Sequence, residues 1–200
     1  MPKSLCLSLY RKLRSRIHSF QLRVGSISCL FAGRCTFLLS SHDQIRQASS
    51  RFAHGVDRLN ADLMKSAYWP DATDDHGFFK GNAHEFCDYV ISTHKHLKAT
   101  MHCMLNHLIQ LDESSGFGHG EVYTVTYVLR EHSGSEFIET WWGRYEDTYE
   151  RRHGEWRIKT RLCIHEFTSA FENNHTMNID VSLFKQGSED RGHSQFNYPC

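Results

Sequence analysis

The feature that most constrains the fold of this chain is a change in the spacing of its apolar residues near residue 100. Before this point apolar residues recur at the spacing of an α-helix, and after it they alternate at a period of two, as in β-strands. Helical segments followed by a run of strands are typical of an α+β fold and not of alternating βαβ units. With 200 residues, of which 40% are hydrophobic, the chain suits one ordinary packed domain. We therefore expect N-terminal helices packed on a curved antiparallel sheet.

The segment before residue 100 predicts three helices. The first begins near Asp43 and carries an apolar stripe formed by Ile45, Ala48, Phe52, Val56, Leu59 and Leu63. Asn60 and Asp62 are suitable caps for a short second helix that ends near Tyr68. Gly81-Asn82 opens the third helix, whose apolar positions are Ala83, Phe86, Cys87, Val90, Ile91, His94 and Leu97.

Turn signals divide the rest of the chain into strands. Pro70-Asp71 predicts a turn, and Thr73–Phe79 predicts a short strand or the arm of a hairpin. Four longer strands are expected at Thr100–Leu111, Gly120–Glu131, Ser135–Arg152 and Glu155–Thr168. Ser133-Gly134 and His153-Gly154 suit the hairpins that connect the last three of these strands.

The first long strand is apolar on both faces. One face carries Met101, Cys103, Leu105, Ile109 and Leu111, and the other carries His102, Met104, Asn106 and Leu108. A strand of this kind needs cover on both sides. The helices can cover one side, so we expect a second subunit on the other, in a homodimer or homotrimer.

The charge distribution separates residues 1–42 from the rest. This stretch holds seven basic residues and no acidic residue, so residues 43–200 hold 16 basic and 23 acidic residues, a net charge of about −7. An acidic body without a basic stripe argues against nucleic-acid binding. No run of about 18 apolar residues exists, so we expect no membrane-spanning helix.

The basic stretch is typical of a mitochondrial or plastid transit peptide, or of an over-extended gene start. We therefore expect the folded domain to cover residues 43–172, followed by an irregular tail over 173–200. The seven cysteines are scattered, form no CxxC pair and leave one over, which favours reduced thiols. A cytoplasmic location is expected, or a mitochondrial one if residues 1–42 are a transit peptide.

Five motifs resemble SnoaL-like proteins of the nuclear-transport-factor-two-like superfold. In the first half these are Phe52–Arg58 (FAHGVDR), Tyr68–Ala72 (YWPDA) and Gly77–Gly81 (GFFKG). Thr100–Asn106 (TMHCMLN) and Gly143–Ile158 resemble the family's His-bearing strand and its closing hairpin. The resemblance covers roughly residues 43–168 and implies a cone-shaped α+β barrel. Relatives include scytalone-dehydratase-like enzymes, bile-acid dehydratases and the hexachlorocyclohexane dehydrochlorinase.

The resemblance also implies a catalytic set. In the dehydrochlorinase the working residues are an Asp on the first helix, a His on the first long strand and an Arg late in the last strand. By motif these match Asp57, His102 and Arg161, although Arg161 faces the cavity only if a bulge shifts the phase of its strand. One departure is Phe52, where that enzyme has a Lys and some dehydratases have a Tyr. This departure argues against halide expulsion.

An Asp that faces a His is the arrangement of an oriented general base, because the carboxylate fixes the tautomer of the imidazole. The unperturbed histidine pKa near ~6.5 suits proton abstraction at neutral pH. We expect Tyr68, Asp74 and Tyr145 to be acids or carbonyl partners for a substrate. His54 lies one helical turn before Asp57, at the expected cavity mouth, and Asn106 shares the strand face of His102.

The function that this pattern favours is a cofactor-independent lyase or isomerase, of the dehydratase type, acting on a small apolar cyclic substrate. His84, His94 and His96 do not share one helix face, so we expect no metal site. Two alternatives remain open: a non-catalytic ligand-binding or scaffold module of the same fold, and the small subunit of a ring-hydroxylating oxygenase.

Overall fold

The computed structural model describes residues 40–173, 180 and 184. The chain divides into two compact units, Met1–Ser41 and His42–Cys200, and the description below concerns the second. The expectations for a targeting segment or misassigned start, and for most of the irregular tail, lie outside the described residues. The proposed boundary at residue 42 stays a prediction.

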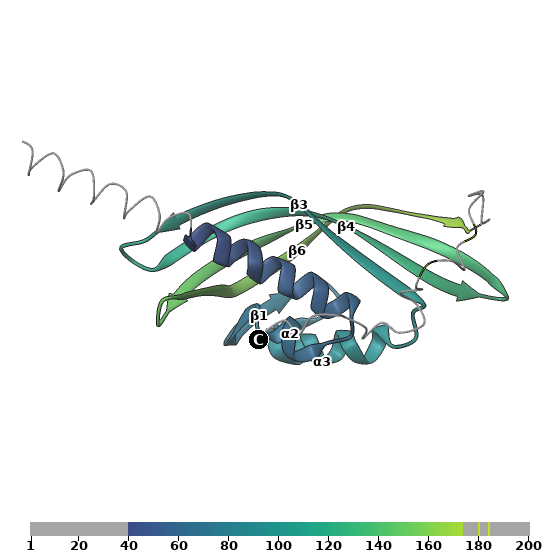
Figure 1. Ribbon diagram of the computed structural model, residues 1–200, viewed down its shortest axis with the longest axis horizontal. Coiled ribbons are helices and arrows are strands. Elements are labelled where there is room, and N and C mark those ends of the chain that lie inside the picture. The colour runs from purple at the N-terminus through teal and green to yellow at the C-terminus, as the bar shows by residue number, and fades with distance from the viewer. Residues whose placement is uncertain (1–39, 174–179, 181–183, 185–200) are drawn as a thin grey trace, which may run out of the picture. The chain divides into compact units, whose positions relative to one another are not determined.

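The described residues form helices followed by a six-stranded sheet, which confirms the α+β class (Figure 1). Within the second unit a helix spans residues 42–57. The other elements are α2 (Ala61–Lys65), β1 (Tyr68–Asp75), β2 (Lys80–Asn82), α3 (Ala83–His94), β3 (Ala99–Asp112), β4 (Phe117–His132), β5 (Ser135–Arg152) and β6 (Glu155–Glu172). The strand order is β2-β1-β6-β5-β4-β3. The expected antiparallel sheet is in fact mixed, because β1 pairs with β6 in parallel.

The short helices begin where the sequence provides caps. The side chain of Asn60 accepts a hydrogen bond from the Leu63 amide, and that of Asn82 accepts from the amides of His84 and Glu85. α2 packs very closely on the preceding helix at Gly55, where an added Cβ would lie 2.6 Å from the backbone nitrogen of Met64. A side chain at position 55 would push the two helices apart.

Two expectations between residues 60 and 75 were wrong. The second helix ends at Lys65, and Pro70-Asp71 lies inside β1 instead of forming a turn. The ladder between β1 and β6 is interrupted between Tyr68 and Thr73, so Pro70 removes no hydrogen bond from a regular pair.

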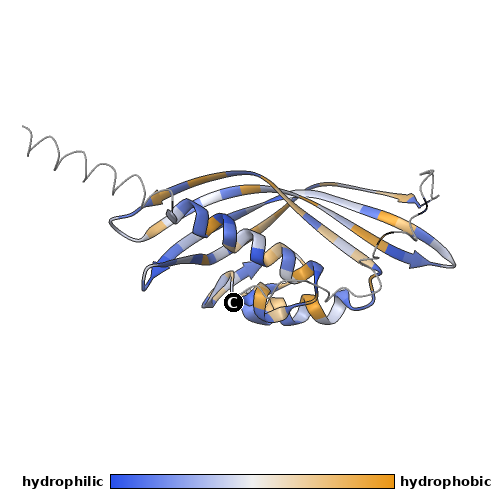
Figure 2. Ribbon diagram, viewed as in Figure 1, coloured by the Kyte–Doolittle hydropathy of each residue, from blue (hydrophilic) through white to orange (hydrophobic). Residues whose placement is uncertain are grey.

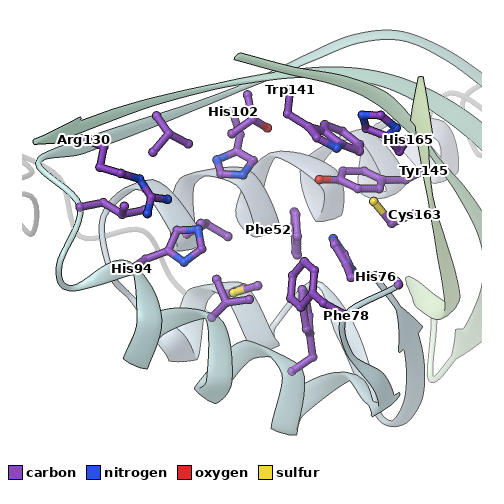
Figure 3. Close-up of a pocket in the computed structure, with 18 residues that line it drawn as sticks. Phe52, His76, Phe78, His94, His102, Arg130, Trp141, Tyr145, Cys163 and His165 are labelled. Atoms are coloured by element: carbon purple, nitrogen blue, oxygen red, sulfur yellow. The ribbon is translucent and has the colours of Figure 1, made fainter. Parts of the chain in front are cut away.

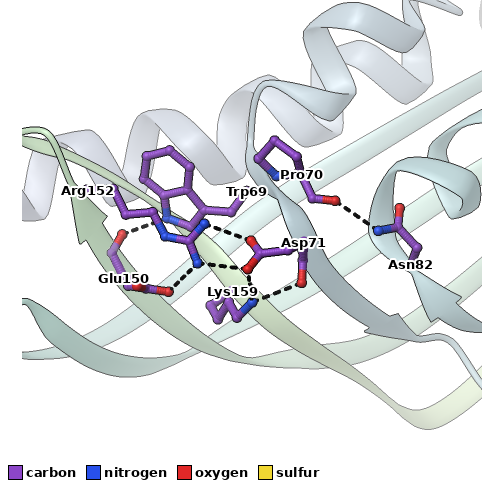
Figure 4. Close-up of polar contacts among 7 residues, drawn as sticks. All are labelled: Trp69, Pro70, Asp71, Asn82, Glu150, Arg152 and Lys159. Carbon is purple, nitrogen blue, oxygen red and sulfur yellow. Dashed lines mark hydrogen bonds and ion pairs between the residues drawn. The ribbon is translucent and has the colours of Figure 1, made fainter.

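Side chains replace the missing ladder at this interruption (Figure 4). Arg152 donates two hydrogen bonds to the Asp71 carboxylate, at 2.8 and 3.0 Å, and Lys159 donates to the backbone oxygen and the carboxylate of the same residue. The guanidinium of Arg152 also lies 5.0 Å from the centre of the Trp69 ring. Hydrogen bonds from Arg152 and Lys159 hold the pKa of Asp71 below its usual value. These contacts fix the start of β1 against β5 and β6.

Register shifts change which residues of the long strands face the helices. In β3 the shift falls between Met104 and His107, and in the β5–β6 pair one shift falls between Thr148 and Tyr149. A bulge of this kind adds one residue to a strand and reverses the in–out pattern beyond it.

The helices cover one face of the sheet, and the core lies between them (Figure 1). Apolar residues recur along the long strands as well as on the helices (Figure 2). The face of the sheet turned away from the helices exposes Met101, Leu108, Tyr123, Tyr127, Leu162 and Phe167. In its middle, Arg144 forms ion pairs with Glu121 and Glu166. We refer to this surface as the open face.

In the described part of the chain, none of the helices combines the length and the apolar character needed to cross a membrane.

Candidate functional site

A cavity of about 490 Å³ lies between the helices and the inner face of the sheet (Figure 3). Its wall is largely apolar and aromatic, with residues such as Phe52, Val56, Phe86 and Trp141. Four histidines also line it: His76, His94, His102 and His165. A cavity of this size and lining suits a small organic ligand.

Asp57 and His102 form the predicted contact. Oδ1 of Asp57 lies 2.7 Å from Nδ1 of His102, and Oδ2 accepts a hydrogen bond of 2.9 Å from the His102 backbone amide. The two side chains are only 13% and 9% exposed. Asp57 is the last residue of its helix and His102 lies near the start of β3, so the pair joins the helical layer to the sheet.

The Asp57 carboxylate is held in its ionised form. Burial acts to raise the pKa of Asp57, but the hydrogen bonds and the charge of His102 outweigh burial and lower the pKa below its usual value. An ionised acceptor at Nδ1 favours the tautomer that carries its proton there. Nε2 of His102 is then the nitrogen that can take a proton from a ligand.

Tyr145, expected as an acid or carbonyl partner, is among the residues that line the cavity. Figure 3 shows its hydroxyl directed toward the middle of the cavity. Burial raises the pKa of Tyr145 well above its usual value, so the hydroxyl stays protonated. Tyr145 is therefore placed to donate a hydrogen bond to a carbonyl oxygen of a ligand.

Arg161 is turned inward but does not line the cavity. Its guanidinium lies 4.4 Å from the centre of the Phe52 ring and 4.2 Å from that of Tyr145, so these rings lie between it and a ligand. It donates two hydrogen bonds, at 2.8 and 2.7 Å, to the buried carboxylate of Asp147. The register shift between Thr148 and Tyr149 produces this inward direction. The expected direct contact between Arg161 and a substrate is not supported.

Tyr68 and Asp74 lie one layer behind the cavity wall. The Tyr68 hydroxyl donates a hydrogen bond of 2.7 Å to Oδ2 of Asp74, and Oδ1 of Asp74 contacts Nδ1 of His76. Neither Tyr68 nor Asp74 lines the cavity, whereas His76 does. The two predicted residues can thus reach a ligand only through His76.

His76 is the residue that the sequence analysis missed. A signal was present, because residues two apart on a strand project to the same side, and Asp74 and His76 have this spacing. His76 follows directly after β1 and packs its ring against Phe86, with 4.2 Å between ring centres.

His54 and Asn106 are not among the residues that line the cavity. His54 is turned about 200° around the helix from the lining residue Phe52, since each helical residue advances about 100°. Asn106 falls within the register shift of β3, after which His107 and not Asn106 faces inward. It is exposed instead.

Outside the cavity lining, His107 contacts the hydroxyl of Tyr149 through Nε2 at 2.9 Å. Burial lowers the pKa of His107 to about 4, so the imidazole is neutral at physiological pH. Within residues 40–173, no three His, Cys, Asp or Glu side chains lie close enough together to hold a metal ion.

Comparison with known proteins agrees with this architecture. None of the curated protein sequences matches the chain significantly. Among solved structures, a type 2 hexachlorocyclohexane dehydrochlorinase superposes with a TM-score of 0.60 at 17% identity, covering 68% of this chain and 92% of that one. A candidate scytalone dehydratase from Novosphingobium aromaticivorans gives 0.58 at 14% identity, covering 68% and 90%.

A nuclear-transport-factor-two-like protein from Novosphingobium aromaticivorans gives a TM-score of 0.55 at 19% identity, covering 68% of this chain and 87% of that one. At these identities the structural neighbours establish the fold alone. The sequence model of the SnoaL-like domain matches residues 38–162, which is more than half of the chain. The chain therefore belongs to the SnoaL-like domain family and has the nuclear-transport-factor-two-like fold.

Proposed function

We propose that this protein is a cofactor-independent lyase or isomerase that acts on a small, largely apolar cyclic substrate. The observation that carries the proposal is the Asp57–His102 pair, with 2.7 Å between Oδ1 and Nδ1, at the wall of a cavity of about 490 Å³. An imidazole oriented in this way is a general base, which typically contributes about 10²–10⁴-fold to a rate.

In this reaction Nε2 of His102 takes a proton from a carbon next to a carbonyl group. The Tyr145 hydroxyl donates a hydrogen bond to the carbonyl oxygen, where negative charge develops. Arg161 adds a positive charge behind the Tyr145 ring. The largely apolar and aromatic wall suits an apolar ring. Two of the structural neighbours are named for elimination reactions, one for dehydration and one for dehydrochlorination. These names support a lyase but do not define the substrate.

The test is a panel of hydroxylated, chlorinated and enone ring compounds, assayed with the wild type and with His102→Ala. We expect turnover of hydroxylated or enone rings by the wild type and a loss of at least about 100-fold in His102→Ala. Because position 52 holds Phe, dehydrochlorination of small haloalkanes should be slow or absent. The matched control is His96→Gln, an exposed histidine outside the cavity lining, which should retain full activity.

Turnover that survives in His102→Ala would remove His102 from the mechanism. A wild type that binds the ring compounds without converting them would favour a ligand-binding module instead. Absence of both binding and turnover would favour a scaffold.

A further inference from the structure

The cavity wall carries one permanent charge, the guanidinium of Arg130. The wall also holds four histidines, and none of the described residues in its lining is acidic. A hollow whose charged groups all have one sign concentrates a ligand of the opposite sign, so this cavity suits an anion. Proton abstraction by His102 and the hydrogen bond from Tyr145 make no use of Arg130.

Arg130 lies on the inner face of the sheet. Thr126, Val128 and Arg130 are alternate residues of β4, and all three line the cavity. Thr126 is also the residue that pairs with His102 of β3. Four residues of a strand span about 13 Å, at roughly 3.3 Å per residue, so the backbone of Arg130 lies about this far along the sheet from the proposed base.

His94 reaches the same end of the cavity from the helical layer. It is the last residue of α3, and the loop that follows joins β4 where the Lys98 amide donates a hydrogen bond of 3.0 Å to the Leu129 carbonyl. Figure 3 shows the side chains of His94 and Arg130 directed toward one another, at the end of the cavity opposite Tyr145. The C-terminus of a helix favours a cation, so an imidazole here can donate to an anion.

The existing partner of Arg130 leaves room for a ligand. Nε of Arg130 lies 3.3 Å from a carboxylate oxygen of Glu139, and the two side chains are 51% and 43% exposed. An exposed ion pair of this kind contributes little to stability. Among the described residues, the two terminal nitrogens of the guanidinium have no hydrogen-bond or ion-pair partner. A carboxylate can bind to this edge through two parallel hydrogen bonds.

We propose that the ligand of this cavity carries a carboxylate on a short apolar arm, and that Arg130 and His94 bind this carboxylate while the ring of the ligand lies beside His102. The identification of this ligand as the substrate rests on the proposed function. A single permanent cation matches the single charge of a carboxylate, whereas a phosphate carries nearly two charges at neutral pH. The distance along β4, less the reach of the Arg130 side chain, suits an arm of a few carbons.

Two probes of nearly equal shape separate the charge from the ring. 4-Phenylbutanoate has a ring, an apolar arm and a carboxylate, and 4-phenylbutanamide is its neutral counterpart. Binding is followed by NMR through the Cε1–H signal of labelled His102, which is assigned by its absence in His102→Ala. We expect the wild type to bind the acid at least about tenfold more tightly than the amide, because hydrogen bonds between charged groups are the stronger ones.

Substitutions at the charged end should act on the acid alone. Arg130→Gln should raise the Kd of the acid by about tenfold and that of the amide by less than about twofold, and His94→Gln should raise the Kd of the acid by about threefold. Glu139→Gln should lower the Kd of the acid by about two- to threefold, because it removes the competing carboxylate. Lys95→Gln is the matched control, since Lys95 is exposed beside His94 but lies outside the lining, and it should change neither Kd.

The melting temperature of each variant is measured alongside, so that a loss of binding is not confused with a loss of fold. Equal binding of acid and amide by the wild type, binding of neither, or equal losses on both probes in Arg130→Gln would overturn the inference. Tighter binding of 3-phenylpropyl phosphate than of the acid, lost in Arg130→Gln, would overturn the choice of a carboxylate.

The binding experiment and the turnover panel fail independently. Selective binding of the acid by a protein that converts none of the ring compounds would support the carboxylate site and count against the proposed function. Turnover of neutral rings by a protein that does not prefer the acid would support the proposed function and overturn the carboxylate site.

Discussion

Asp57 holds His102 with both oxygens of its carboxylate, 2.7 Å from the ring nitrogen Nδ1 and 2.9 Å from the backbone nitrogen. The first contact orients the imidazole, and the second ties the end of a helix to the start of β3. One carboxylate therefore serves both the position of the proposed base and the stability of the fold. The two contributions can be separated by substitution.

Asp57→Asn should lower kcat on the hydroxylated ring probe by at least about tenfold, with little change in KM, because the neutral amide no longer fixes the tautomer of His102. The free energy of unfolding should fall by about 1–2 kcal/mol, since the amide oxygen can still accept from the backbone. Steady-state kinetics and urea unfolding measure the two effects. Asp43→Asn, at an exposed ion pair with Arg46, is the control and should change neither. A rise in KM at constant kcat would show that Asp57 serves binding instead.

Asp147→Asn should lower the free energy of unfolding by about 3–5 kcal/mol, because it leaves the buried guanidinium of Arg161 without its partner charge. The double variant Asp147→Asn with Arg161→Met should lose less than Asp147→Asn alone. Urea unfolding of the single and double variants tests this, with Arg46→Met, at an exposed ion pair with Asp43, as the control. A double variant that loses the sum of the two single effects would contradict the buried-charge explanation.

The stability of the fold should fall as pH is lowered from about 6.5 toward about 4 because of His107. Burial lowers the pKa of His107 from 6.5 to about 4 in the folded protein, so in this window the unfolded chain binds a proton that the folded chain does not. The contribution of neutral His107 to the free energy of unfolding is fully present above pH 6.5. As the pH is lowered below 6.5, the free energy of unfolding declines by up to about 1.4 kcal/mol per pH unit. His107→Gln should flatten the pH dependence of urea unfolding over this range. Parallel wild-type and variant curves would exclude His107 as the cause.

The open face should join two or three copies of the chain, because six large apolar side chains lie exposed on it. Met101→Lys combined with Phe167→Lys should dissociate the oligomer at micromolar concentration, as measured by sedimentation. Tyr89→Lys, at an exposed aromatic residue on α3, should leave the assembly unchanged. The ion pairs of Arg144 in the middle of this face then lie within the interface. A wild type that sediments as a monomer would refute the prediction.

Much of the fold could be predicted from the sequence, because periodicity and caps are local properties. The change of period near residue 100, the cap Asn82 and the turn glycines Gly134 and Gly154 led to the third helix and the long strands at nearly their observed bounds. The cap Asn60 gave the start of the second helix but not its end. The contact between Asp57 and His102 followed from the resemblance of their motifs to one family. It did not require any knowledge of the register.

The remaining assignments depended on the tertiary structure, because a single-residue shift in pairing reverses the direction of every side chain beyond it. Such a shift turns Arg161 inward, behind the rings of Phe52 and Tyr145, and another leaves Asn106 exposed. The parallel pairing of β1 with β6 is equally non-local, and it fixes the strand that carries Asp74. His76 enters the cavity only because that strand is followed by a turn that packs its ring on Phe86. The sequence by itself determined the elements and one histidine–carboxylate pair, whereas packing between distant segments decided which other side chains reach the cavity.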